Sequence, residues 1–486
     1  MNKPRYLAGV VALILAGCSF APAYHAPQTS VPAQFKENGD WAAGKPEDAA
    51  PKGAWWQAFG DAQLNQLETS LNASNPTLQA ALAHYDAVRD ILVQTRASLF
   101  PDVFGLGSLS RNRQSVNRPL RGGNEPNIYS SNLLGGGISY ELDLWGNVRN
   151  QVQAALATTQ AQAALLANAQ LSLQSQLASD YLSLRGLDRE AHVLDEDITA
   201  FSVSYRITRD RYLGGIASGL DVSRAQTQLE SVKALRDNLT GRRAVLEHAI
   251  AVLTGNNPST FHVAVASGMV PIPKIPVGIP SKLLQRRPDV AAAERSLFAA
   301  NALIGVAKAA YFPNLTLDAV GGYESTGPGH WLTSPNLFWS LGPSFLVQIF
   351  DANAIKAQVA QAKANYVSKT ADYRNTVLNA FREVEDQMAL LNSEGIEAAD
   401  SAAATQAAQQ TTHLAFIQYR EGAVNYLEVM IAQATELQAE QIDIALQTRR
   451  MVDTVNLIRS LGGSWQQKDL PSENSLSTQK VVESHT

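Results

Sequence analysis

Apolar and polar residues alternate in four segments of the chain, which form two pairs within residues 102–144 and 315–349. A period of two with one apolar face predicts half-buried β-strands. The first pair runs loosely from Asp102 to Arg111 and then up to Leu144. The apolar sets are Val103, Gly105, Gly107 and Leu109; Ile138, Tyr140, Leu142 and Leu144; Leu315, Leu317, Ala319, Gly321 and Tyr323; and Leu337, Trp339, Leu341, Phe345, Val347 and Ile349.

Two properties favour strands that cross a membrane over the strands of a soluble sandwich. The segments approach the ~10 residues that a tilted strand needs, and aromatic residues such as Trp145 and Trp339 stand near their ends or along the apolar face. Four strands cannot close a barrel, and lipid does not tolerate an open sheet edge. The pattern therefore predicts an oligomer that shares one barrel. Three copies would supply twelve strands, but the residues alone do not fix that number.

Two long proline-free stretches, 147–211 and 353–418, follow the strand pairs. Both are rich in small residues, and in the first of them apolar residues recur at helical spacing. About 65 residues at roughly 1.5 Å each predict a rod of ~100 Å. Close antiparallel packing of such rods occurs in an ordinary coiled coil or bundle. That alternative does not account for the membrane-like strands that accompany each rod.

Each rod ends in a glycine-containing turn that leads into a returning helix. Glycine suits the left-handed cap of the first helix, and Ser218 or Asn425 is suited to begin the second. Asp221 and Glu428 then lie in the first turn of the returning helices, where a carboxylate stabilises the helix dipole. That structural role alone is enough to explain both acids.

The two halves of the chain resemble each other. Leu99-Phe100-Pro101-Asp102 is echoed 212 residues later by Tyr311-Phe312-Pro313-Asn314. Leu220-Asp221-Val222 is echoed 207 residues later by Leu427-Glu428-Val429. The near-constant offset predicts a duplicated unit of roughly 200 residues, each composed of a helix, two strands, a very long helix, a tight turn and a helix.

The amino terminus has the features of a bacterial lipoprotein signal. A short basic region precedes the apolar run from Tyr6 to Leu15, which is too short to cross ~30 Å of hydrocarbon but suits secretion. Small residues then precede Cys18, the only cysteine, which predicts a cleaved signal and a lipid on Cys18. Ser19 in place of aspartate favours the outer membrane. The alternative is a plain signal peptide with a chance cysteine.

Composition narrows the function further. Hydrophobic residues make up 45% of the chain and charged residues 17%, which excludes an intrinsically disordered protein. The net charge of −5 gives no indication of a nucleic-acid partner. A single cysteine excludes an internal disulfide and a cysteine-based zinc site. The eight histidines are scattered, and motifs for catalysis or phosphate binding are absent, so we expect no enzyme activity, no cofactor and no metal site.

With these features the chain resembles the TolC-like outer membrane factor family, in its lipoprotein branch. The most specific stretch begins with Gly278-Ile279-Pro280-Ser281-Lys282-Leu283-Leu284-Gln285-Arg286-Arg287-Pro288-Asp289 and continues through Ala293-Glu294-Arg295 to Tyr311-Phe312-Pro313. Near the amino terminus, Trp55-Trp56-Gln57-Ala58-Phe59-Gly60-Asp61 also matches. The resemblance covers nearly the whole mature chain. It implies an α+β membrane protein: a homotrimer with one 12-stranded outer-membrane β-barrel, continued by a long periplasmic α-helical barrel with an equatorial girdle.

The resemblance also implies where the duct closes. Asp221 falls at a family position that holds the closed helix tips together, and Leu427 and Glu428 fall where hydrophobic or acidic rings narrow the pore. The sequence departs from the family at two positions. Ile431 stands where many members carry a pore-lining aspartate, and Val424 stands where some carry a gating arginine. The acidic ring of this chain therefore rests on Glu428.

The expected function is that of a passive outer-membrane exit duct for small toxic compounds, joined to a periplasmic adaptor protein and an inner-membrane resistance-nodulation-division transporter. The alternatives are a duct for type I polypeptide secretion and, in a different class, a lipid-anchored periplasmic coiled-coil tether. The expected organisation is a signal peptide over 1–17, a lipid-anchored extended segment over 18–60, a first repeat over 61–260, an equatorial linker over 261–287, a second repeat over 288–463 and a polar tail over 464–486.

Overall fold

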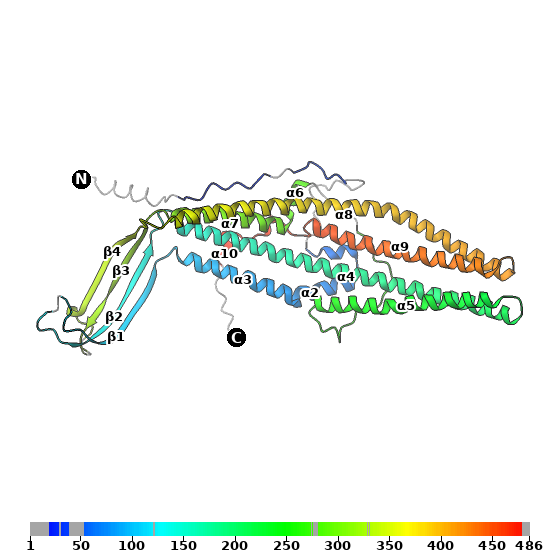
Figure 1. The fold of residues 1–486 in the computed structure, drawn as a ribbon, viewed down its shortest axis with the longest axis horizontal. Helices are drawn as coiled ribbons and strands as arrows, with labels where there is room; N and C mark the ends of the chain where they lie inside the picture. The colour runs from blue at the N-terminus through cyan, green and yellow to red at the C-terminus, as the bar shows by residue number, and fades with distance from the viewer. Residues whose placement is uncertain are drawn as a thin grey trace.

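The protein is a long, narrow molecule with a β-sheet at one end and helical hairpins reaching to the other (Figure 1). The structure is a computed structural model, which describes residues 19–28, 31–37, 53–119, 122–273, 275, 280–327, 329 and 331–478. The predicted signal peptide and Cys18 lie outside the described residues. The helices are η1 (Trp55–Phe59), α2 (Ala62–Ser74), α3 (Pro76–Ala97), α4 (Asn147–Leu213), α5 (Gly219–Leu253), α6 (Pro280–Arg286), α7 (Pro288–Ala309), η2 (Ser334–Asn336), α8 (Ala354–Glu421), α9 (Tyr426–Ser460), η3 (Gln467–Asp469) and α10 (Glu473–Thr478).

Four strands form one antiparallel sheet in the order β1-β2-β3-β4, as the alternating segments predict. They span Asp102–Arg113, Ile128–Glu141, Asn314–Ser325 and Leu337–Leu346. In this chain β1 and β4 are therefore the two edge strands. Pro343 lies in β4 opposite Leu317, so the residue that lacks a backbone N–H is on an edge.

The predicted ends of two strands are wrong. Leu142 and Leu144 lie beyond β2, because Asp143 turns the chain into α4 by accepting hydrogen bonds from the backbone N–H groups of Val148 (3.1 Å) and Arg149 (2.9 Å). The second half of the chain makes the same kind of aspartate-closed turn after β4. There Asp351 accepts a hydrogen bond from the backbone N–H of Ile355 (2.8 Å), which leaves Val347 and Ile349 outside the strand.

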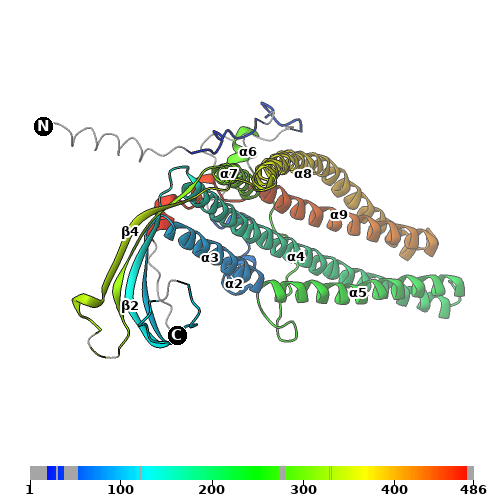
Figure 2. The same ribbon diagram turned by 60° about the vertical axis from the view of Figure 1, so that its left-hand side comes forward.

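The two longest helices, α4 and α8, run unbroken from the sheet to the far end of the molecule, whereas their neighbours are stacked in pairs (Figures 1 and 2). Their 67 and 68 residues correspond to about 100 Å each at ~1.5 Å per residue. The hairpin partners α5 and α9 end near the middle of the molecule. There α3 continues the line of α5, and α7 continues the line of α9.

Each stacked pair is joined by a side chain at the start of the helix nearer the sheet, which is α3 in one pair and α7 in the other. The Asn75 amide donates to the Leu253 carbonyl at the end of α5 (2.7 Å). At the other joint the buried Arg287 donates to the Ser460 carbonyl at the end of α9 (3.0 Å). Arg287 also pairs with Asp289 (2.6 Å) and Glu383 (2.8 Å). Arg287 and Asp289 belong to the stretch 278–289 that carries the family resemblance, so these contacts give that stretch a structural role.

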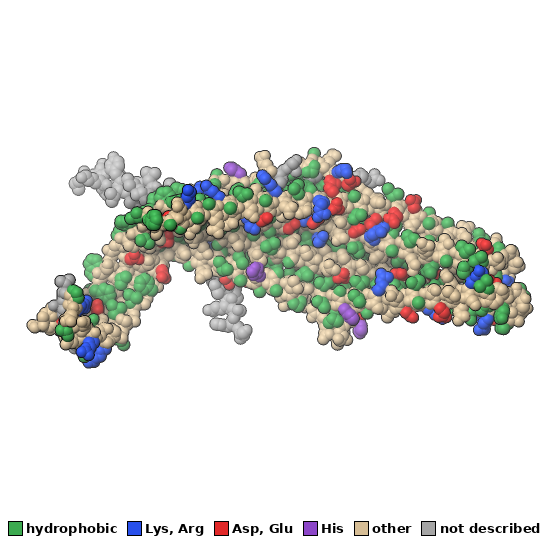
Figure 3. All heavy atoms as spheres, in the orientation of Figure 1, with side chains coloured by type: hydrophobic (Ala, Val, Ile, Leu, Met, Phe, Trp, Pro, Cys, Tyr) green, Lys and Arg blue, Asp and Glu red, His purple; other side chains and the backbone are tan. Residues whose placement is uncertain are grey.

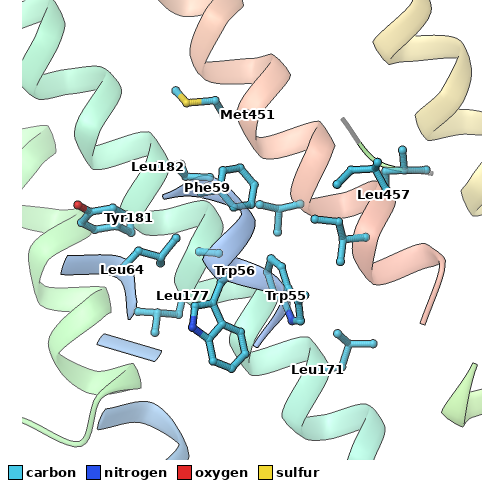
Figure 4. Close-up of a cluster of buried hydrophobic side chains, with 14 of the residues drawn as sticks. Trp55, Trp56, Phe59, Leu64, Leu171, Leu177, Tyr181, Leu182, Met451 and Leu457 are labelled. Carbon is cyan, nitrogen blue, oxygen red and sulfur yellow. The ribbon is translucent and has the colours of Figure 1, made fainter. Parts of the chain in front are cut away.

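The main hydrophobic core lies at this middle level (Figure 4). Trp55 and Phe59 of η1 and Leu64 of α2 insert between α4 and α9, and they are all but fully buried. The Tyr181 hydroxyl on α4 donates to Asp61 (2.9 Å), which also begins α2 by accepting hydrogen bonds from the backbone. The segment just before the first repeat is thus part of the core of the molecule.

The chain after α9 packs back onto the helices near the sheet. Leu476 of α10 is buried against Leu92 and Val152. The Gln160 amide donates to the Pro471 carbonyl (3.1 Å). The segment expected to be a polar tail therefore contributes an apolar contact, because its leucine Leu476 faces the gap between α3 and α4.

One helix among the described residues, α7, is long and apolar enough to cross a bilayer by length and composition, with a mean hydropathy of 1.3. More than half of that stretch is buried inside the protein, where α7 packs against α4 and α8. Ala299 and Ala302 meet Ala154 and Ala157 of α4 at this contact. Its apolar composition therefore matches a packed core helix.

Glu68 is a buried acid that is expected to lower stability as the pH rises. Its side chain in α2 is fully buried, and neither carboxylate oxygen has a hydrogen-bond partner in the described part of the chain. Burial raises the pKa of Glu68 from 4.5 to about 9. The folded protein therefore holds a proton that the unfolded chain releases above pH 4.5. Stability is highest below that pH and falls as the pH rises toward about 9.

Glu68→Leu should raise the free energy of unfolding at pH 7 by about 1–3 kcal/mol, since keeping the acid protonated there costs roughly 1.4 kcal/mol per pH unit. Thermal melting of the purified protein at pH 5, 7 and 9 measures the effect. Glu68→Gln is the matched control. It keeps a polar group buried, so it should gain less, but it should flatten the pH dependence equally. A pH dependence that persists in both variants would contradict this account.

Candidate functional site

One face of the sheet is an apolar band. The strand register places Val103, Ile138, Ala319 and Leu341 side by side across all four strands. Rows nearer the loops contain Leu134, Tyr323, Leu337 and Trp339, and most of these large side chains are exposed. Figure 3 shows hydrophobic side chains gathered on the sheet, with Lys and Arg at its loop end. An exposed apolar band on a sheet is suited to contact with lipid.

The opposite face of the sheet carries the polar side chains, together with apolar ones in its middle rows such as Phe104, Leu106 and Val320. Asp318 on β3 accepts hydrogen bonds from the hydroxyls of Ser139 on β2 (2.7 Å) and Ser344 on β4 (3.0 Å). Thr316 and Ser344 share a further hydrogen bond (3.0 Å). Nearer the loops, the Ser131 hydroxyl donates to Glu324 (3.0 Å). Charged and hydroxyl groups are costly to place in an apolar environment, so this face is suited to contact with water.

At the other end of the molecule, Asp221 lies in the first turn of α5 and is tied to its own helix. Its carboxylate accepts a hydrogen bond from the Ser218 hydroxyl (3.0 Å) and pairs with Arg224 (3.5 Å). The Ser218 hydroxyl in turn accepts a hydrogen bond from the Asp221 N–H (3.2 Å). Within this chain Asp221 therefore makes the capping contacts expected of an acid at a helix start.

Leu427 and Glu428 lie in the first turn of α9. The backbone N–H of Leu427 donates to the side chain of Asn425 (3.0 Å), which begins the helix, and the leucine is half-buried. Glu428 is exposed, and its carboxylate makes no hydrogen bond or ion pair with the described residues. Ile431 follows one turn after Leu427 on the same side of α9 and is 51% exposed. Val424 packs against the buried tyrosines at the tip.

The two hairpins of the chain are fastened to each other by residues to which the sequence assigned no function. The Arg211 guanidinium at the end of α4 donates to the carbonyls of Tyr419 and Arg420 at the end of α8 (both 2.6 Å). It also lies 4.5 Å from the centre of the Tyr419 ring. The last carbonyls of a helix lack the regular intrahelical partner, and a cation that donates to them makes a strong contact. The Tyr419 carbonyl also accepts the N–H of Gly422 (3.0 Å), so the arginine is its second donor.

A buried tyrosine pair lies directly behind this contact. The Tyr419 hydroxyl bonds Thr208 of α4 (3.2 Å), and its ring meets that of Tyr426 edge to face at 5.5 Å. Burial, with smaller contributions from Tyr419 and Asp221, raises the pKa of Tyr426 to about 12. Tyr419 is 4% exposed, whereas its repeat counterpart Tyr212 is 49% exposed, so the two halves differ here.

Near the sheet, the first described residues bind along α4 and α7. Ser19 donates to Asn150 of α4 (3.0 Å), Lys308 of α7 donates to the Phe20 carbonyl (3.3 Å), and Asn301 donates to the Pro22 carbonyl (2.8 Å). The Phe20 ring stacks on Phe312 with a 4.6 Å separation. These contacts fix the chain immediately after Cys18 at the junction of sheet and helices, although Cys18 itself is not described.

Within the described ranges, no group of three or more His, Cys, Asp or Glu side chains comes together as metal ligands. What the molecule offers instead is a sheet with one apolar and one polar face, joined to two tightly fastened hairpins. This is the architecture of a membrane channel protomer with a helical extension. The chain belongs to the outer membrane efflux protein family, whose model matches residues 68–256 and 279–463 and confirms the resemblance noted in the sequence.

Known proteins agree with this assignment. The chain is 33% identical over 468 residues to the antibiotic efflux pump outer membrane protein ArpC of Pseudomonas putida, with 96% of each chain covered. It is 29% identical to the cation efflux system protein CusC of Escherichia coli, with 96% of this chain and all of CusC covered. The structure superposes on the outer-membrane channel OprN with a TM-score of 0.85 at 28% identity, over 92% of this chain and 100% of that one.

Proposed function

We propose that the protein is the outer-membrane exit duct of a tripartite efflux pump, a homotrimer whose sheets form one 12-stranded β-barrel. One observation carries the proposal: a sheet with an apolar face ends in two unpaired edges, β1 and β4. Unpaired N–H and C=O groups are too costly in lipid, so β4 of one copy pairs with β1 of the next. Closed barrels begin at about 8 strands, so two or more copies satisfy the size limit, and the family resemblance favours three.

The helical hairpins continue this barrel as a water-filled tube through the periplasm, and the tips close it. The polar sheet face with Asp318 supports an aqueous interior. At the tips, threefold symmetry turns Leu427 and Ile431 into apolar rings and the unpaired Glu428 into a ring of carboxylates. A narrow apolar constriction and a charged ring are devices that set conductance and ion selectivity.

The periplasmic partners are inferred from the helix tips. Leu213, Ile216 and Leu220 are exposed at the α4–α5 turn, which supports docking of a periplasmic adaptor there. The adaptor links the duct to an inner-membrane transporter of the resistance-nodulation-division class, which supplies the energy. The cargo is a small toxic compound, since the relative ArpC is a component of an antibiotic efflux pump.

Light scattering and planar-bilayer recording of the purified protein test this function together. The expected result is a particle with the mass of three chains that conducts ions in small, cation-selective steps. A periplasmic tether would give no conductance, and that outcome would overturn the proposal. Co-purification with an adaptor and a transporter, rather than with a secreted polypeptide and its exporter, separates efflux from type I secretion.

Lipid on Cys18 is expected to anchor the protein without building the pore. A single acyl signal binds membranes weakly, whereas a closed barrel is firmly inserted by itself. Cys18→Ala with a cleavable signal peptide should therefore still produce trimers in the outer membrane, as measured by heat-modifiable migration of membrane fractions on gels. Loss of all trimer in this variant would show that the lipid is needed for assembly.

A further inference from the structure

A cavity of about 550 Å³ lies at the middle level of the molecule, where the linker after α5 crosses α4 and α9. Its apolar wall comes from the linker, from α8 and from α9. The residues are Met269, Val270, Ile272, Ala398, Ile444 and Met451. The volume is within the range of small-molecule sites in proteins. The cavity is far from both the sheet and the helix tips, so the proposed duct function does not require it.

The linker that forms the outer wall is fixed in place. Asp188 on α4 pairs with Arg243 of α5 (2.7 Å) and accepts a hydrogen bond from the N–H of Ala266 in the linker (3.2 Å). Arg185 donates to the Gly268 carbonyl (3.1 Å). The cavity is therefore bounded by a preformed wall and not by a loose strand, which favours binding because no ordering is required.

The polar groups in the cavity are only partly satisfied. Arg185 is engaged by Asp61, by the Tyr181 hydroxyl and by the linker. In contrast, the side chains of Arg189 and Arg450 make no hydrogen bond or ion pair with the described residues, and the Nε atom of each is buried. Asp443 accepts one hydrogen bond from Gln447 (2.5 Å), and its Oδ1 is buried without a donor.

We propose that this cavity binds an amphiphilic anion, with one acidic group held by Arg189 and Arg450 and a hydrocarbon portion against the apolar wall. Two guanidinium groups without partners among the described residues and one carboxylate, Asp443, line the cavity, so these groups leave an excess of one positive charge. A guanidinium group that has no protein acceptor makes strong charge-assisted hydrogen bonds to a carboxylate ligand. A neutral compound leaves both donors unpaired, and a cation is repelled.

Binding of decanoate to the purified full-length protein tests the site, with decanol and decyltrimethylammonium as probes of equal chain length and different charge. The protein is held in amphipol, so no detergent micelle competes, and calorimetry measures affinity and stoichiometry. We expect one decanoate per chain and binding at least ~10-fold weaker for the other two probes. Arg189→Gln and Arg450→Gln should each weaken decanoate binding ~10-fold.

Two further variants separate the site from general effects of charge or folding. Arg206→Gln changes an exposed arginine of α4 outside the cavity and should leave binding unchanged. Ala398→Phe fills the cavity without altering its charge and should weaken binding. Equal affinity for decanol, or binding that survives both arginine substitutions, would overturn the proposal, as would absence of binding to a normally melting protein. Conductance does not enter this test, so its outcome is independent of the duct function.

Discussion

Leu341→Arg is expected to block assembly of the protein in the outer membrane. Leu341 lies in the apolar row with Val103, Ile138 and Ala319 and is 65% exposed in the single chain. An arginine on the lipid face of a barrel costs about 2–4 kcal/mol near the bilayer midplane. Because the substitution recurs in every copy of a trimer, the total of roughly 6–12 kcal/mol is comparable to the stability of a whole domain.

Ser340→Arg is the matched control, since it places the same side chain one residue away on the polar face. It should yield heat-modifiable trimers in membrane fractions at nearly the normal amount, whereas Leu341→Arg should yield little. Leu317→Arg, on the neighbouring strand, should behave like Leu341→Arg. Equal tolerance of the two faces would mean that the apolar band does not contact lipid.

Arg211→Ala is expected to open the periplasmic end of the duct. The change removes two charge-assisted hydrogen bonds from α4 to the end of α8, and each such bond contributes about 1.5–3 kcal/mol. We expect opening to break both bonds, and ~1.4 kcal/mol shifts a two-state equilibrium tenfold, so the fraction of open channels should rise at least tenfold in the variant. Single-channel recording in planar bilayers measures the open fraction and the conductance.

Arg209→Ala removes an exposed arginine two residues away and should leave the channel closed, so it is the control for the loss of charge. The proposed gate residues Asp221, Leu427 and Glu428 predict separate effects. Leu427→Ala should raise conductance by widening the constriction, and Glu428→Gln should weaken cation preference without opening the pore. Asp221→Ala should loosen any hydrogen bond that Asp221 makes to another hairpin and so also raise conductance. Its capping contacts alone predict a stability loss of ~0.3–1 kcal/mol and an unchanged channel. Unchanged conductance and selectivity in all of these variants would place the gate elsewhere.

Strand alternation predicted the sheet where one face carries no polar residue, as from Leu315 to Tyr323. It failed for the first half of β2, because Ser130 and Asn132 occupy positions on the otherwise apolar face near the loops. That part of the strand is held by backbone pairing to β1 and β3, which leaves no periodic signal in side-chain polarity. The helix lengths were predictable, because a stretch of more than 60 residues without proline has no residue that must break the helical hydrogen bonding.

The contact between the hairpins was not predictable from the sequence. An arginine in the last turn of a helix normally stabilises its own end, and Arg211 fits that pattern. Its actual acceptors belong to Tyr419 and Arg420, more than 200 residues away, and become neighbours only through the fold. The sequence repeat gives no help here. Tyr212 and Tyr419 occupy matching positions, which predicts similar surroundings, but only Tyr419 is buried.

The stacked helices have a mechanical consequence. Two joints interrupt the helical part of the molecule, one where α3 meets α5 and one where α7 meets α9. The helices are in line at each joint, but their backbones are not connected there. Hydrogen bonds from Asn75 and Arg287 link them instead. A torque applied at the tips is transmitted toward the sheet mainly by α4 and α8, because among the described helices only these two run from the sheet to the tips without a break. Each joint resists such a torque less than a continuous helix does, because side-chain hydrogen bonds and not backbone covalent bonds close it.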